Sequence, residues 1–343
     1  MMRITHKPLL YLFLCLLVTT MFALVANAQG KDDCGAIFKR FDSNYKSPEI
    51  EKKQVAVAAA KEFLEKCSDQ KGNEKTRDYF KTNLPVLEDT VDRLQFNAGL
   101  AAKDYETIFP VGQRILTRGP DDLGLMITLT SIGYSAWSGK QSLDKIRDDT
   151  SKIGKGALSL LDKADPATLT QFVTASCKDG RVLEIGELNF VIANITFYSG
   201  DHNGSLPYYY HSIGQGCSAS QHVESYIAIS IVYNDEYQRL ATERQSKLSA
   251  ASNHETAETE KLLALATGYA ARLYDVYGRA YNIASADPNS AADRKAVLLT
   301  NAKQLYIFCN NGKMDGFDSW LKGVSATPMP DPTKPVDPVL LTK

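Results

Sequence analysis

The chain has 343 residues, of which 39 are Lys or Arg and 40 are Asp or Glu, so its formal net charge is −1. A hydrophobic fraction of 44% with 23% charged residues is typical of a folded globular protein and excludes wholesale disorder. The near-zero net charge also argues against a nucleic-acid-binding protein, which usually carries a strong basic excess.

Residues 1–28 are predicted to be a secretory signal peptide. A basic start is followed by an apolar core over residues 9–25 and by the small residues of Ala26-Asn27-Ala28. We therefore expect cleavage after Ala28 and an exported chain, periplasmic or secreted, that crosses no membrane once mature. The alternative is an uncleaved membrane anchor, because the apolar core is barely long enough to span a bilayer.

Five cysteines follow the predicted cleavage site, and export implies an oxidising compartment in which cysteines pair. Cys34 opens the first helical stretch and Cys67 closes the second, so an antiparallel helix pair brings them together. Cys177 and Cys217 bracket a second helix pair in the same way, which leaves Cys309 unpaired. Each bridge closes a loop of about 35–40 residues and is expected to stabilise the fold by roughly 3–4 kcal/mol. The alternative is that all five are small core residues.

Residues 29–137 are predicted to form N-terminal helical repeats, because apolar residues recur with helical spacing and strand alternation is scarce. Ser47-Pro48-Glu49 is typical of a helix start, with a capping hydroxyl, a proline in the first turn and an acid near the positive end of the helix dipole. This helix is expected to end near Cys67. Further helices are predicted over residues 86–102, 104–118 and 122–137.

Residues 138–165 are predicted to be a polar connecting region and the internal boundary of the chain. They include three glycines, Gly139, Gly154 and Gly156. Asp165-Pro166 then predicts the start of a short helix, because Asp caps the free amides and Pro fits the first turn.

Residues 166–326 are predicted to form C-terminal helical repeats. Helices are expected over residues 181–198, 205–215, 221–244, 290–308 and 315–324, with a polar break at 245–253. Residues 255–286 are expected to form one long helix or two. The remaining residues 327–343 form a Pro-rich tail, in which five of eleven residues are proline between positions 328 and 338. Such a segment cannot form a helix or a central strand, so we expect an extended, solvated tail. The alternative is a segment that docks to a partner.

The stretch from Gly186 onward resembles a tetratricopeptide repeat, a family of 34-residue helix pairs with small residues where the two helices cross. With Gly186 as the first position, the matching residues are Ile192 and Ala193 in the first helix, Gly200-Asp201 in the turn, and Ser205, Tyr209 and Ser212 in the second helix. Cys217 replaces the closing proline and Asn189 the early tryptophan. An earlier stretch, counted from Asp89, matches the family at the turn over 103–105 and at Pro120.

The resemblance implies an all-α fold of stacked antiparallel helix hairpins, an α-solenoid whose first helices line a concave surface that binds a protein or peptide. The residues that it places on this surface are Arg93, Asn97, Phe190, Asn194, Phe197, Tyr198 and Glu224. The alternative for Phe190 and Phe197 is that they belong to the core. Asn194 and Tyr198 are the stronger candidates, because an Asn within an apolar helix needs a partner or solvent.

No motif of the chain indicates catalysis. The segment from His254 to Glu258 is similar to the HExxH pattern of zinc proteases, but Glu258 takes the place of the second histidine, so an acidic helix start explains it better. We therefore expect no enzyme activity, metal or other cofactor. The sequence favours an exported scaffold for a protein or peptide partner, with a cell-envelope structural protein and an extracytoplasmic helical hydrolase as alternatives.

Overall fold

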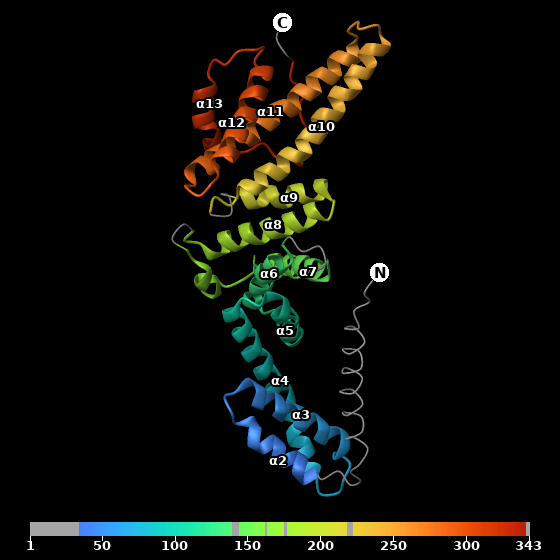
Figure 1. Cartoon of the computed structure of the whole chain (residues 1–343), viewed down its shortest axis with the longest axis vertical. Coiled ribbons are helices and arrows are strands. Elements are labelled where there is room, and N and C mark those ends of the chain that lie inside the picture. Colours follow the sequence, from blue (N-terminus) through green and yellow to red (C-terminus); the bar gives the residue numbers. More distant parts are fainter. Residues whose placement is uncertain (1–33, 139–143, 162, 175–176, 218–221, 341–343) are drawn as a thin grey trace, which may run out of the picture. The chain divides into compact units, whose positions relative to one another are not determined.

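A computed structural model describes residues 34–138, 144–161, 163–174, 177–217 and 222–340. The predicted signal peptide lies outside these ranges. The described residues form helices joined by turns and extended connections, with no strand, which confirms the all-α prediction (Figure 1). None of their helices has the length and apolar content needed to cross a bilayer. The chain divides into two compact units, and each is described by itself: unit 1 ends at Ile115 and unit 2 begins at Leu116.

Unit 1 is built from three helices and the first part of a fourth. They are α2 (Cys34–Tyr45), α3 (Ile50–Lys66), α4 (Glu74–Ala102) and α5 (Tyr105–Arg118). The core of this unit is aromatic. The ring of Phe80 lies 4.7 Å from that of Phe41 and 5.1 Å from that of Phe63, both edge-on. Aromatic rings in this geometry attract one another beyond the area that they bury, so they fix α2, α3 and α4 together.

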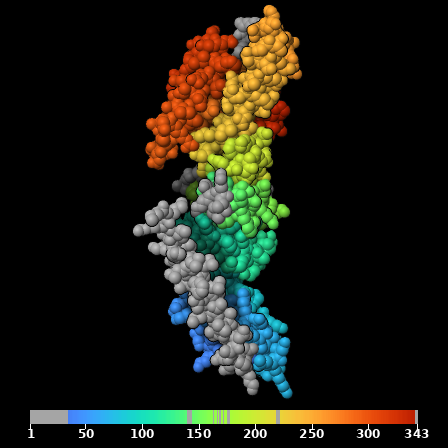
Figure 2. All heavy atoms as spheres, turned by 45° about the vertical axis from the view of Figure 1, so that its right-hand side comes forward, coloured from blue at the N-terminus to red at the C-terminus, as the bar shows by residue number. Residues whose placement is uncertain are grey.

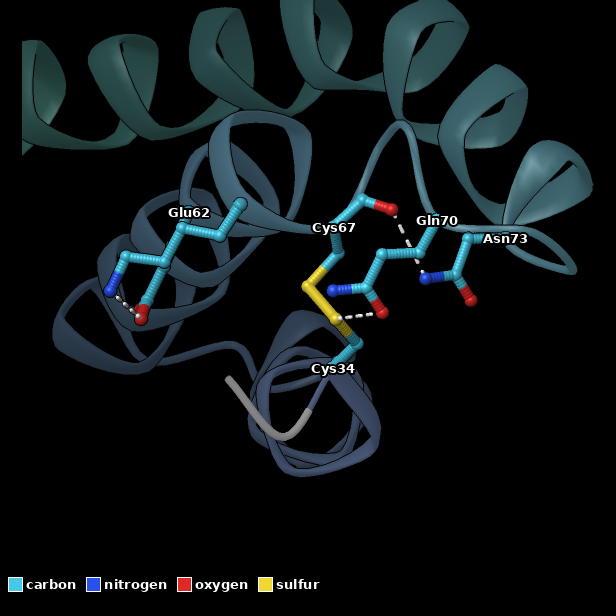
Figure 3. The surroundings of a disulfide bond; sticks show 6 residues. Cys34, Glu62, Cys67, Gln70 and Asn73 are labelled. Carbon is cyan, nitrogen blue, oxygen red and sulfur yellow. Dashed lines mark hydrogen bonds and ion pairs between the residues drawn. A yellow bond between two sulfur atoms is a disulfide. The ribbon is translucent and has the colours of Figure 1, made fainter. Parts of the chain in front are cut away.

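A disulfide between Cys34 and Cys67 ties the start of α2 to the residue that follows α3, as predicted (Figure 3). The connection to α4 is held to the same point, because the side-chain amide of Asn73 donates to the carbonyl of Cys67 at 3.1 Å. Helix α4 starts twelve residues before the predicted Val86 and contains Pro85. The burial of Phe80, on this added stretch, gives the helix its early start.

Unit 2 consists of the helices that follow α5. They are α6 (Leu123–Trp137), α7 (Asp144–Leu161), η2 (Pro166–Phe172), α8 (Gly180–Tyr198), α9 (His202–Ile213), α10 (Val223–Ala250), α11 (Ala257–Ala286), α12 (Ala292–Cys309), α13 (Phe317–Gly323) and η4 (Val324–Ala326). From α6 to α12 each helix packs on the next, so α8 lies beside α9 and α10 beside α11 (Figure 1). A second predicted disulfide, Cys177–Cys217, joins the residues before α8 and after α9.

Capping side chains set the starts of several of these helices. The carboxylate of Asp179 accepts from the amide of Arg181 in α8, and that of Asp201 accepts from Gly204 in α9. Asp165 caps the predicted short helix, which is a 3-10 helix. Each cap satisfies an amide that has no partner within its helix. Helix α10 runs to Ala250, through part of the predicted polar break, before the chain turns into α11.

The prediction of a polar connecting region over 138–165 is wrong for residues 144–161, which form α7. This helix has a buried stripe, Thr150, Ile153, Gly154, Ala157 and Leu161, at helical spacing. Its other face is charged, which explains why its composition resembles that of a linker. Gly154 lies where α7 meets both neighbours: a Cβ there would stand 3.1 Å from the side chain of Thr130 in α6 and 3.4 Å from that of Ile192 in α8.

The Pro-rich tail has no helix over residues 327–340, as its prolines predict, but the structure differs from a solvated tail. Met329 is 7% exposed, and Pro332 is buried. The amide of Val339 donates to the carbonyl of Ala264 in α11 at 2.8 Å. The tail therefore lies against unit 2. Figure 2 shows part of it, in dark red, on the surface beside α9 and α10.

Candidate functional site

The helices α6, α8, α10 and α12 alternate with α7, α9 and α11 along unit 2, and side-chain contacts link each of the four to the next. We call these four the first helices of the pairs that the family resemblance implies. The ring of Trp137, at the end of α6, meets that of Tyr198, at the end of α8, with 6.2 Å between centroids. Tyr134 in α6 lies 6.3 Å from Phe190 in α8. Because the end of α6 meets the end of α8 and earlier residues of both helices also meet, α6 and α8 run in the same direction.

His222 connects α8 with α10. Its imidazole stacks on the ring of Phe190 with 3.9 Å between centroids and 12° between planes. Its Nε2 lies 3.3 Å from both carboxylate oxygens of Glu187 in α8. The ring is thereby oriented from two sides, by an aromatic and an acidic side chain of α8, directly before the first residue of α10.

An ion pair connects α10 with α12. The guanidinium of Arg294 donates to a carboxylate oxygen of Glu224 at 2.8 Å, and both side chains remain partly exposed. Burial raises the pKa of Glu224, but the hydrogen bond and charge of Arg294 more than offset this, so the pKa is lowered overall. Glu224 lies in the first turn of α10, where a negative charge also favours the helix dipole.

We use the term first-helix face for the surface that carries these contacts. Its residues are Glu187, Tyr198, His222, Glu224 and Arg294, and the ring of Tyr198 lies against the buried Trp137. Tyr198 is 69% exposed although its ring is a large apolar surface. Aromatic side chains are enriched at protein–protein interfaces, which makes Tyr198 the candidate contact residue of this face.

The other predicted surface residues of α8 are buried. Phe190 and Phe197 belong to the apolar core of unit 2, as their alternative interpretation holds. Asn194 is 4% exposed: its amide nitrogen donates to the carbonyl of Phe190 at 2.8 Å, and its oxygen accepts from the hydroxyl of Tyr209 in α9 at 3.3 Å. Asn194 therefore finds the partner that an apolar helix requires inside the hairpin and not on a binding surface.

Arg93 and Asn97 lie on α4 of unit 1. Both side chains are exposed, and the Nε of Arg93 donates to the carboxylate of Asp89, one turn earlier, at 2.7 Å. This pair lies within one helix. Of the seven predicted surface residues, Tyr198 and Glu224 thus lie on the first-helix face of unit 2.

Glu184 is a buried acid that the sequence analysis did not single out. It is 8% exposed in α8, and burial, followed by the charge of Glu187, raises its pKa to about 7. The signal was present in the sequence, since Glu184 stands between Leu183 and Ile185 on an apolar helix. The thiol of Cys309, also in unit 2, has its pKa raised to about 12 by burial.

The acidic segment before α11 is tied into ion pairs. Glu258 accepts from the ammonium of Lys247 in α10 at 2.6 Å, and Glu255 pairs with Arg244. Both carboxylates are thus neutralised by α10, as an acidic helix start allows. Among the residues that the structure describes, no group of three or more His, Cys, Asp or Glu is placed to hold a metal ion.

Comparison with known protein families, with curated proteins and with solved structures finds no match.

Proposed function

We propose that this protein is an exported scaffold of tetratricopeptide-like helix pairs, which binds a protein or peptide at the first-helix face of unit 2 and catalyses no reaction. The observation that carries the proposal is Tyr198, an exposed aromatic side chain that lies against Trp137 on one side of a row of same-direction helices. Partner binding would cover this ring, and aromatic side chains are enriched at the centre of protein–protein interfaces.

The repeat-like character rests on small residues at helix crossings. Ala193, Ser205 and Ser212 occupy the small positions of the family pattern, and all three are fully buried. Tyr209 stands at the aromatic position and is also buried. Small side chains let α8 and α9 approach closely, and Gly154 does the same for α7 against its neighbours. A fold of this kind buries its apolar faces by stacking pairs and leaves one row of helices available.

Two disulfides support export. Such bonds persist in oxidising compartments and are rare in the reducing cytosol. Each bridge joins helix ends within its own unit and stabilises that unit by restricting the conformations of the unfolded chain.

The expected partner segment has mixed chemistry. An apolar or aromatic side chain would cover Tyr198, while polar groups would meet the Glu224–Arg294 pair, whose side chains are partly exposed. Exposed ion pairs contribute little to affinity but fix orientation, so the aromatic contact is expected to dominate the binding energy.

The test is site-specific photo-crosslinking in the native cell envelope. A photoreactive amino acid at position 198 is compared with the same group at Lys261, an exposed position on the second helix α11. We expect a crosslinked species of defined mass from position 198 that is absent from position 261 and weakened by Glu224→Ala. Equal labelling from both positions, or none from position 198 in a folded chain, would contradict the proposal.

A further inference from the structure

The segment 327–340 lies on unit 2 in the manner of a bound peptide. Its backbone is extended before and after a turn at residues 332–334, and the side chain of Asp331 closes this turn by accepting from the amide of Thr333 at 2.8 Å. It crosses α11 in the opposite direction to that helix, from Arg279 at its beginning to Ala264 at its end.

Arg279 holds the beginning of the segment by its backbone. The side chain is 6% exposed, and its Nη1 donates to the carbonyl of Thr327 at 2.7 Å, with a longer bond from Nη2 to the carbonyl of Pro328. Asp275, one turn earlier in α11, orients the guanidinium at 2.8 Å. A buried guanidinium that donates hydrogen bonds to main-chain carbonyls recognises an extended backbone and not a particular side chain.

The middle of the segment is anchored by apolar side chains. Met329 joins the same core cluster as Tyr209 of α9, Tyr226 of α10 and Val276 of α11. Pro332 is buried as well. A proline-containing segment loses little conformational entropy when it binds, because its extended form is already favoured in the free chain.

The end of the segment passes so close to α11 that only a glycine fits there. A Cβ at position 268 of α11 would collide with the main-chain oxygen of Asp337 and would stand 3.0 Å from the side chain of Val336. Two residues later, the amide of Val339 donates to the carbonyl of Ala264. Gly268 thus lets a second backbone approach the helix closely, as glycines do where a ligand backbone must come near.

The groove extends beyond its occupant. Beside residues 325–329 there is an open cleft of about 800 Å³, bounded by the end of α9, by α11 and by the segment itself. Its polar wall includes His211, Gln215 and Asn282, together with Arg279. The volume is in the range of sites that take drug-sized ligands or several residues of a peptide.

We propose that this groove over α9, α10 and α11 is a binding site for extended, proline-containing peptides, and that residues 327–340 are its intramolecular occupant and keep such peptides out. The tethered segment acts at an effective concentration in the millimolar range. For a peptide with a Kd of about 10 μM, this competition weakens apparent binding by on the order of 100-fold. The proposal concerns a different surface from the first-helix face and does not depend on it.

The test measures binding of a fluorescent synthetic peptide with the sequence of residues 327–340 to the full chain by anisotropy. Met329→Asp in the full chain places a charge in the apolar site of the segment and is expected to release it without altering the groove. We expect the released chain to bind the peptide on the order of 100-fold more tightly than the wild type. A peptide with the same Met329→Asp change is the matched control and is expected not to bind.

A groove substitution makes the assignment specific. Adding Gly268→Val to the released chain is expected to abolish peptide binding, because the new side chain occupies the path of residues 336–337. A released chain that keeps its helical circular dichroism yet binds no peptide overturns the proposal. Equal affinity of the wild type and the released chain also overturns it, since the groove would then not be occupied by the segment.

Hydrogen exchange of the wild-type chain tests whether the segment can be displaced, and it does so even if Met329→Asp prevents folding. A displaceable segment opens without unfolding α11, so residues 327–340 are expected to exchange faster than the buried part of that helix. Exchange of both at one common rate would mean that the segment is an integral part of the core, which contradicts the proposal.

Discussion

The carboxyl group of Glu184 on α8 is buried, and its pKa is raised to about 7 by this burial and by the charge of Glu187. The unfolded value is near 4.5. Between these values the native state holds a proton that the unfolded chain has released, so the free energy of unfolding falls as the pH rises from about 4.5 to 7. The shift corresponds to at most about 3 kcal/mol.

Glu184→Gln is therefore expected to remove this part of the pH dependence. Urea unfolding at pH 5 and pH 8 measures it: the wild type loses stability between the two values, while the variant loses less and is the more stable protein at pH 8. The same change at Glu260, an exposed position of α11, is the control. Identical pH dependence of the wild type and Glu184→Gln would show that the carboxyl group ionises freely in the folded state.

At the scale of elements, Gly154 sets how closely α7 approaches α6 and α8. Valine at this position would press on Thr130 and Ile192, so Gly154→Val is expected to cost about 1–3 kcal/mol although valine has a better helix propensity than glycine. Chemical denaturation measures the loss. Gly323→Val is the control, because a Cβ there has no neighbour within 4 Å. Equal effects of the two changes would refute a close crossing at Gly154.

Helix starts could be predicted where residues next to the boundary set them. Helix α7 could not be predicted from its composition. The cap at Asp165 and the helix pair around Gly200 follow from residues within one turn of the boundary. Helix α7 carries many charges, so its composition favours a linker, and only the spacing of Ile153, Ala157 and Leu161 shows its buried stripe. The start of α4 was missed for a related reason: Phe80 is fixed by rings of α2 and α3, which are distant in sequence.

The candidate site was predictable only in part, because its residues act across helices. Tyr198 and Glu224 follow from the family resemblance, and both stay at the surface. The resemblance cannot show that Tyr209 satisfies Asn194 from the facing helix, or that Arg294 reaches Glu224 across 70 residues of chain. Side-chain pairs of this kind depend on tertiary packing, which a single sequence does not encode locally.

At the scale of the whole molecule, the two units each contain one disulfide, whereas both tryptophans, Trp137 and Trp320, lie in unit 2. Replacing Cys34 and Cys67 by serine is expected to destabilise unit 1 by roughly 3–4 kcal/mol. Urea unfolding followed by circular dichroism should then begin at a lower concentration, while tryptophan fluorescence, which reports unit 2, keeps its midpoint.

The reciprocal variant is the control. Replacing Cys177 and Cys217 by serine removes the bridge of unit 2 and is expected to move the fluorescence transition itself. A common shift of both signals in the Cys34 and Cys67 variant would mean that the two units unfold as one cooperative block.

The two disulfides also bear on how the protein can acquire its bonds. Among the five cysteines of the described residues, each native bridge joins a cysteine to the next one along the chain, and Cys309 comes after both. An oxidase that joins cysteines in the order in which they emerge from a translocation channel would therefore make the correct pairs at the first attempt. We therefore expect oxidative refolding of the reduced chain to need an electron acceptor but no disulfide isomerase.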